Sequence, residues 1–159
     1  MTAARVSPRV LAVLLTAAAC SWTAAVFCAP MVRGRSPLLA STVDLVGSVV
    51  CHQRDERSFH FNGQRLPVCG RCTGLYLAGA IGALIAWRGR GLAPSRPRQL
   101  LILAALPTIA TIAVEWAGII DPGNTLRAVA AVALGGAAGW LFVRVLRAEE
   151  QPGTCAIIT

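Results

Sequence analysis

Residues 10–30 read VLAVLLTAAACSWTAAVFCAP, a stretch without a charged side chain that follows Arg5 and Arg9. Its length matches the roughly 20 residues that an α-helix needs to cross a hydrocarbon core of about 30 Å. A cleaved signal peptide would show the same basic start and apolar core, and residues 17–20 faintly resemble a lipoprotein cleavage site. Because the apolar run continues beyond any such cut, we favour a retained membrane anchor.

Three further apolar blocks continue this pattern along the chain. They cover residues 73–87, 99–120 and 126–146. Apolar residues make up 55% of the chain and charged residues 14%, whereas soluble domains average about 25% charged residues. The mean hydropathy is +0.62. The sequence therefore predicts an all-α integral membrane bundle of about four transmembrane helices.

A shorter apolar segment, residues 37–50, precedes the polar part of the chain. Its apolar side chains recur with helical spacing and Asp44 lies on its polar side. The segment is too short to span a bilayer, so we expect a helix at the membrane interface or packed on the bundle. We further expect a single transmembrane domain over residues 1–147, with a signature loop at 51–76, and a disordered tail at 148–159.

The charge distribution predicts how the chain crosses the membrane. The net charge is +8, and the arginines fall between apolar blocks, where they act as topology signals and headgroup contacts rather than as a nucleic-acid site. The linker at 88–98 carries four arginines and the turn at 121–125 carries none. By the positive-inside rule this difference favours cytoplasmic positions for both termini. We expect a multi-pass protein of a bacterial cell membrane, with lipid as its partner, no nucleic-acid partner, and an extracytoplasmic signature loop.

Small residues mark one face of two apolar blocks. They are Gly74, Gly79 and Gly82 in the second block, and Gly135, Gly136 and Gly139 in the fourth. Such faces allow helix backbones to approach closely. We expect them to support tight helix packing, and a homo-oligomer through these faces is a further expectation.

The polar stretch between the first two long apolar blocks concentrates thiols and imidazoles. It contains Cys51, His52, His60, Cys69 and Cys72, whereas the other three cysteines lie in the first block or the tail. A C-x2-C pair lets two thiolates reach one tetrahedral metal ion, and an upstream cysteine with either histidine would complete the ligand set. Zinc suits such ligands best, while iron and copper(I) are compatible with thiolate-rich ligation.

The same cysteines would also suit a redox site or a structural disulfide. Cys69 and Cys72 stand at the start of a membrane helix beside Arg71, which favours the thiolate form that a thiol–disulfide oxidoreductase needs. A plain disulfide that staples the loop would suit an oxidising compartment. The chain has no phosphate-binding glycine loop, G-x-S-x-G or H-E-x-x-H motif, so the sequence leaves open whether the protein is an enzyme.

Charged and polar groups outside this stretch are candidates for the same membrane face. Glu115 lies inside an apolar block, where an ionisable group is costly and indicates function by default, and Arg127 is its candidate ion-pair partner. A carboxylate near thiolates would suit a mixed-ligand metal site or a proton relay. The accessory candidates are Arg54, Arg57, Arg71, Glu115, Asp121, Asn124 and Arg127.

The segment that starts at Cys51 also resembles a known family. The residues that carry the resemblance are Cys51-His52-Gln53-Arg54-x-Glu56-Arg57-Ser58-Phe59, then Gly63, and Leu66-Pro67-Val68-Cys69-x-Arg71-Cys72-Thr73-Gly74-Leu75-Tyr76. They are similar to an uncharacterised family of small predicted membrane proteins of bacteria and archaea, a domain of unknown function marked by C-H-Q and C-x-R-C-T-G. The resemblance implies an acidic residue late in the third span, either Glu115 or Asp121, and does not choose among metal site, redox site and staple.

Overall fold

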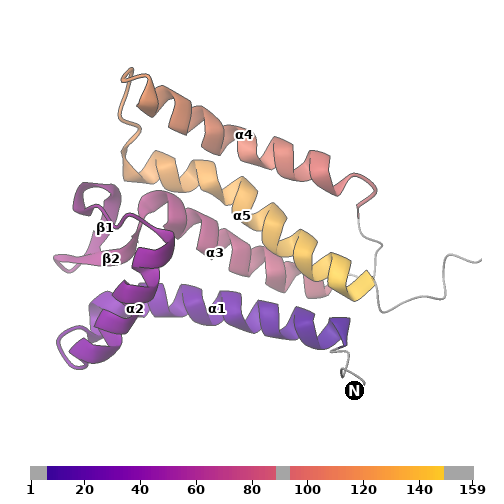
Figure 1. Cartoon of the computed structure of the whole chain (residues 1–159), viewed down its shortest axis with the longest axis horizontal. Helices are drawn as coiled ribbons and strands as arrows, with labels where there is room; N and C mark the ends of the chain where they lie inside the picture. Colours follow the sequence, from indigo (N-terminus) through magenta and orange to yellow (C-terminus); the bar gives the residue numbers. More distant parts are fainter. Residues whose placement is uncertain (1–6, 89–93, 149–159) are drawn as a thin grey trace, which may run out of the picture.

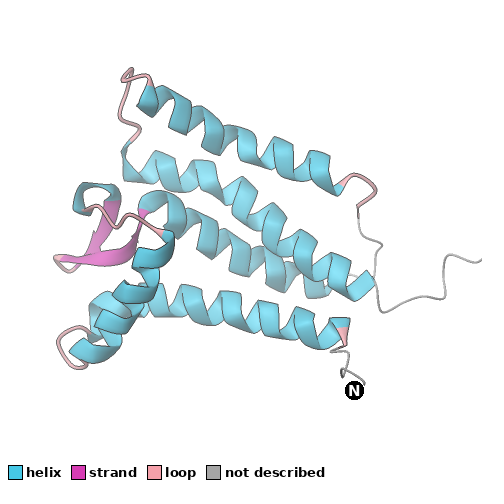
Figure 2. Ribbon diagram, in the orientation of Figure 1, coloured by secondary structure: helices cyan, strands magenta, loops and turns pink. Residues whose placement is uncertain are grey.

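The computed structural model describes residues 7–88 and 94–148. Its four main helices lie side by side (Figures 1 and 2). They are α1 (Pro8–Val32), α3 (Gly70–Ile85), α4 (Pro97–Trp116) and α5 (Gly123–Ala148). In Figure 1 they follow one another in the order α4, α5, α3, α1. The 3-10 turn η2 (Ala86–Arg88) extends α3. The expected, mainly helical architecture is therefore confirmed.

Three helices among the described residues are long and apolar enough to cross a membrane, namely α1, α4 and α5. The block at 73–87 corresponds to α3, which has 16 residues. At 1.5 Å per residue α3 is about 24 Å long, shorter than a hydrocarbon core of about 30 Å. The described residues thus supply three candidate spans and two shorter apolar helices, α3 and the segment Pro37–Val50.

Large apolar side chains cover the outer faces of the candidate spans. Leu14 is 57% exposed, Leu103 65% and Ile109 55%. Soluble monomers rarely expose extended apolar surfaces of this kind. The outer faces therefore suit contact with lipid acyl chains.

The closest helix packing joins α3 to α5. Gly74 and Gly82 on α3, and Gly135 and Gly139 on α5, lie against backbone atoms of the opposite helix, where an added Cβ would collide. The two small-residue faces expected from the sequence therefore pack on each other within one chain. These faces form a contact between two helices of one chain. The expected homo-oligomer through the same faces stays a prediction.

A two-stranded antiparallel hairpin lies in the polar stretch and corrects the all-α expectation. β1 (Ser58–Phe61) pairs with β2 (Gln64–Cys69), with Ser58 opposite Cys69. The turn residues Asn62 and Gly63 have φ values of 51° and 75°, a left-handed conformation that suits these two residue types. An Asn-Gly pair between strand-forming residues is a hairpin signal, and it was the sequence feature that could have predicted this sheet.

The segment before the hairpin forms α2 (Pro37–Val50), with the same bounds as the predicted short helix, followed by the 3-10 turn η1 (Asp55–Arg57). Asp44 of α2 pairs with Arg33 at 2.9 Å. Leu38 and Val49 are 82% and 83% exposed, which gives α2 an uncovered apolar surface. The predicted disordered tail lies outside the described residues apart from Ala148, the last residue of α5.

Candidate functional site

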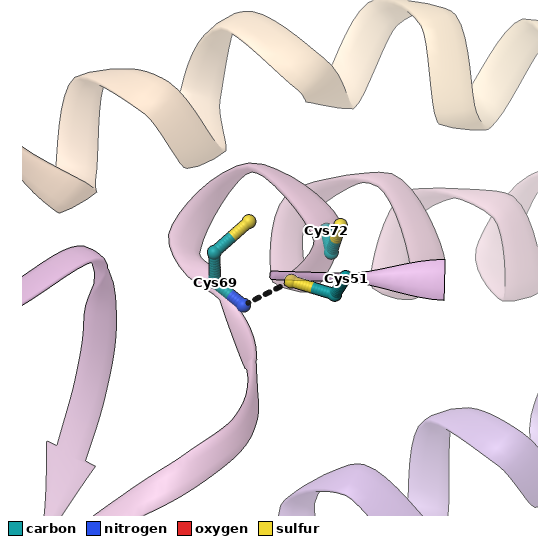
Figure 3. A group of neighbouring side chains, drawn as sticks. All are labelled: Cys51, Cys69 and Cys72. Atoms are coloured by element: carbon teal, nitrogen blue, oxygen red, sulfur yellow. Dashed lines mark hydrogen bonds between the residues drawn. The ribbon is translucent and has the colours of Figure 1, made fainter. Parts of the chain in front are cut away.

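Three cysteine side chains meet at the end of the bundle where the hairpin joins α3. Cys51 follows α2, Cys69 ends β2, and Cys72 lies in the first turn of α3. Their Sγ atoms all lie within 4.8 Å of one another (Figure 3). The described cysteines are free thiols. The hairpin produces this meeting, because it reverses the chain and returns Cys69 to Cys51.

Gln53 ties together the segments that carry the first two thiols. Its Nε2 donates hydrogen bonds to the carbonyl oxygens of Asp44 at 2.6 Å and Pro67 at 2.7 Å. Its own carbonyl accepts a hydrogen bond from Arg65 at 2.8 Å. A Cβ at Gly47 would collide with the Gln53 amide, so the glycine leaves the necessary room. The sequence analysis assigned no role to Gln53, and its only signal was its place beside Cys51 in the C-H-Q motif.

The three thiols share hydrogen bonds that favour a thiolate at Cys51. The Cys51 Sγ accepts a hydrogen bond from the backbone N–H of Cys69 at 3.2 Å (Figure 3). The side chain of Cys69, followed by that of Cys72, holds the pKa of the Cys51 thiol far below its ordinary value, against the opposing effect of burial. A thiolate is the form of cysteine that binds metals and attacks disulfides.

The two histidines lie outside this thiol group. His52 is exposed and lines a cavity beside the thiols. His60 lies on β1, where its Nε2 is 3.3 Å from Asp55 Oδ1 and its side chain is 44% exposed. Among the described residues, the structure therefore brings three of the five predicted ligands within 4.8 Å of one another.

Glu115, near the end of α4, forms ion pairs with arginines from three other elements. Its carboxylate lies 2.8 Å from Arg57 of η1, 3.2 Å from Arg71 of α3 and 3.1 Å from Arg127 of α5. The Glu115 side chain is only 11% exposed, and a low local dielectric strengthens such contacts. Arg127 was the partner suggested by the sequence, whereas Arg57 and Arg71 become partners only through the folding of the hairpin segment.

The start of α5 extends this network to the hairpin. Arg127 pairs with Asp121 at 2.9 Å and donates a hydrogen bond to Asn124 Oδ1 at 3.2 Å. Asn124 Nδ2 donates to the carbonyl oxygen of Ser58 at 3.1 Å. The backbone N–H of Gly123, together with Arg127, lowers the pKa of Asp121. Glu115 and Asp121, the two candidates for the acidic residue expected late in the third span, therefore both contact Arg127.

A cavity of about 370 Å³ joins the thiols to the arginines. It is lined by Val50, Cys51, His52, Gln53, Arg54, Arg57, Cys69, Arg71, Cys72, Trp116 and Arg127. Glu115, Asp121 and Asn124 contact Arg127 without belonging to this lining. All the accessory candidates thus lie in the cavity wall or against it.

Two uncharacterised proteins are similar to this chain over about half of its length. The chain is 33% identical to an uncharacterised protein of Methanothermobacter thermautotrophicus over 78 residues. This alignment covers 49% of this chain and 70% of that protein. The chain is 31% identical to an uncharacterised protein of Methanocaldococcus jannaschii over 84 residues. This alignment covers 52% of this chain and 54% of that protein. The chain therefore spans about half the length of the second relative.

Both of these relatives are archaeal, so they do not support the expectation of a bacterial source. No solved structure matches the chain significantly. A sequence profile of a membrane protein family matches residues 51–141, a region that begins at the first thiol and includes the whole arginine network. This chain belongs to the family described as "Predicted membrane protein (DUF2085)".

Proposed function

We propose that this membrane protein binds a transition metal ion through Cys51, Cys69 and Cys72 at one membrane face, in ion handling or sensing. The observation that carries the proposal is the approach of the three Sγ atoms to within 4.8 Å of one another. On a tetrahedral zinc ion with Zn–S bonds of about 2.3 Å, two thiolates lie about 3.8 Å apart. Small side-chain rotations would therefore close the site around an ion.

Three protein thiolates leave one position of a tetrahedral ion for another ligand. His52 is the better placed of the two histidines, because it lines the same cavity as the thiols while His60 pairs with Asp55. A site with three protein ligands and one open position is typical of zinc that exchanges water or substrate. Zinc is the preferred ion, and iron and copper(I) fit the same donors.

The test is the metal-to-protein ratio of protein purified in detergent under reducing, chelator-free conditions. We expect near-stoichiometric metal in the wild type and a loss of most of it in Cys69→Ser. The matched control is Cys28→Ser, which removes a thiol of α1 that lies outside the group and should retain the metal. Metal-free wild-type protein that also takes up no added ion, or unchanged metal in Cys69→Ser, contradicts the proposal.

The proposed placement in the membrane has four spans, with α3 and η2 crossing together. Residues 70–88 are enclosed on two sides by α1 and α5, which supports a transmembrane position despite the shortness of α3. The arginines of the 88–98 linker favour a cytoplasmic position for that linker and for both termini. The hairpin and the start of α3, which carry two of the thiols, lie at the end of the bundle opposite to the start of α4 (Figure 1). The thiol cluster would then lie on the extracytoplasmic face of a cell membrane, with α2 at the interface. A retained α1 and a single domain over residues 1–147 complete this placement.

The second candidate function is thiol–disulfide exchange through Cys69 and Cys72. It is favoured by the lowered pKa of Cys51, because a thiolate is the attacking species in such exchange, and Cys51 would act as the shuttle thiol for a Cys69–Cys72 disulfide. It predicts a reversible disulfide with a potential between about −270 and −120 mV, the range of catalytic pairs. If oxidant never produces a disulfide among these thiols, this candidate and the disulfide staple are both eliminated.

A further inference from the structure

The cavity beside the thiols has an excess of positive charge. Four arginines line it, namely Arg54, Arg57, Arg71 and Arg127. The carboxylates that pair with them are Glu115, which is shared by three of the arginines, and Asp121, which is 74% exposed. Arg54 is exposed and has no ion pair within residues 7–88 and 94–148. Four guanidinium groups therefore share two carboxylates around one hollow.

Two of these arginines also carry buried donors without an acceptor among the described residues. The Nε atoms of Arg71 and Arg127 are buried and make no hydrogen bond there. The Arg127 side chain is 3% exposed, so bulk water does not reach most of it. Buried donors in folded proteins nearly always have a partner, and an unsatisfied one is destabilising. Arg71 and Arg127 therefore retain hydrogen-bonding capacity that their partners among the described residues do not use.

We propose that this cavity binds a tetrahedral oxyanion of the phosphate class, either inorganic phosphate or the phosphomonoester headgroup of a lipid. Glu115, Asp121 and the Cys51 thiolate leave the four guanidinium groups with one uncompensated positive charge, which a bound oxyanion would balance. Guanidinium forks match the oxygens of a phosphate in paired hydrogen bonds. The volume of about 370 Å³ lies within the range of small-molecule sites.

The network around Glu115 prepares the arginines for this ligand. Because Glu115 holds Arg57, Arg71 and Arg127 at 2.8 to 3.2 Å, their positions are set before the ligand arrives. Preorganised donors bind more tightly, since less side-chain entropy is lost on binding. Arg54 adds a further positive charge at the same cavity. The site consists of protein donors alone, so it extends beyond the metal proposal and does not depend on a bound ion.

The test measures anion binding by reduced, metal-stripped full-length protein. One arm titrates inorganic phosphate into protein in detergent by calorimetry, and the other compares lipid retention in nanodiscs with and without phosphatidic acid. Arg54→Gln removes an exposed charge and should leave the fold intact. We expect it to weaken binding about tenfold, as the loss of a charge-assisted hydrogen bond does. Arg35→Gln is the matched control, because Arg35 is exposed and lies outside the cavity lining.

Each outcome has a defined meaning. Phosphate binding that weakens in Arg54→Gln and not in Arg35→Gln supports the proposal with a free anion. Selective retention of phosphatidic acid, with the same variant pattern and no phosphate binding, supports it with a lipid headgroup. No binding in either arm, or equal weakening by both variants, overturns it. Metal content is measured on separate unstripped samples, so failure of the anion site and failure of the metal site are distinguished.

Discussion

Gln53, which precedes the hairpin, donates a hydrogen bond at 2.7 Å to the carbonyl oxygen of Pro67, near the end of β2. The same amide donates to the carbonyl oxygen of Asp44 at 2.6 Å. Cys51 lies two residues before Gln53, and Cys69 lies two residues after Pro67. The Gln53 side chain therefore joins the segments that carry two of the thiols, in addition to the hairpin and to the hydrogen bond from the Cys69 backbone N–H to the Cys51 Sγ.

Gln53→Ala should loosen the thiol group. It removes both hydrogen bonds and leaves two carbonyl oxygens to find other donors, at a cost of about 1–3 kcal/mol in stability. Loss of a residue that orients ligands lowers metal affinity about 10- to 100-fold. Thermal unfolding in detergent and a competitive zinc titration measure the two effects. Gln64→Ala is the control, since Gln64 is exposed at the hairpin turn. Equal behaviour of the two variants would show that Gln53 has no special structural role.

Gly82→Ala should push α3 away from α5. The added methyl group would collide with the backbone of Gly136, and over-packing of this kind costs about 1–3 kcal/mol. Gly79→Ala, on the same helix, is the control, because its Cβ would lie 3.6 Å from the Gly135 carbonyl oxygen, an ordinary contact. Melting temperatures in one detergent compare the variants. A stability of Gly82→Ala at or above that of Gly79→Ala would contradict the close packing.

Glu115→Gln should destabilise the bundle, because it leaves Arg57, Arg71 and Arg127 without their common carboxylate. Breaking a buried ion pair costs about 3–5 kcal/mol, and we expect the lower end since Arg57 is 38% exposed. Asp55→Asn removes the exposed carboxylate beside His60 and should change stability by less than about 1 kcal/mol. Chemical or thermal unfolding of both variants tests the contrast. Similar small losses in both would show that the network contributes little to stability.

The stability of the reduced, metal-free protein should rise with pH between about pH 6 and 8. The pKa of Cys51 is lowered in the folded protein, so over this window the unfolded chain holds a proton at Cys51 that the folded chain has released. Raising the pH then favours folding, by at most about 1.4 kcal/mol per pH unit, and the gain is lost as the pH falls through the folded pKa. Cys51→Ser should flatten this slope, and Cys28→Ser should keep it. A wild-type slope of zero or of opposite sign would show that Cys51 is protonated in the folded protein.

Helical segments were predictable because apolar runs and short linkers are local properties of the chain. The segment at 37–50 has the same bounds as α2, and the run at 10–30 lies within α1. The hairpin was not predicted although Asn62-Gly63 is a local signal, because Gly63, Pro67 and Gly70 were interpreted as positions of a structured loop. The two glycine faces were recognised, but their spacing carries no information on whether they pack within a chain or between chains.

The sequence by itself determined that the chain is mainly helical and apolar, and that its chemistry-bearing residues concentrate between residues 51 and 72. The tertiary structure decided which of those residues meet. It grouped Cys51, Cys69 and Cys72 without the histidines, and it gave Glu115 three arginines from three elements. The physical reason is that helix formation depends on periodicity over neighbouring residues. The meeting of thiols and guanidinium groups depends instead on contacts between separate segments. These are the reversal of the chain in the hairpin, the hydrogen bonds of Gln53, and the close packing of the α3 and α5 glycines.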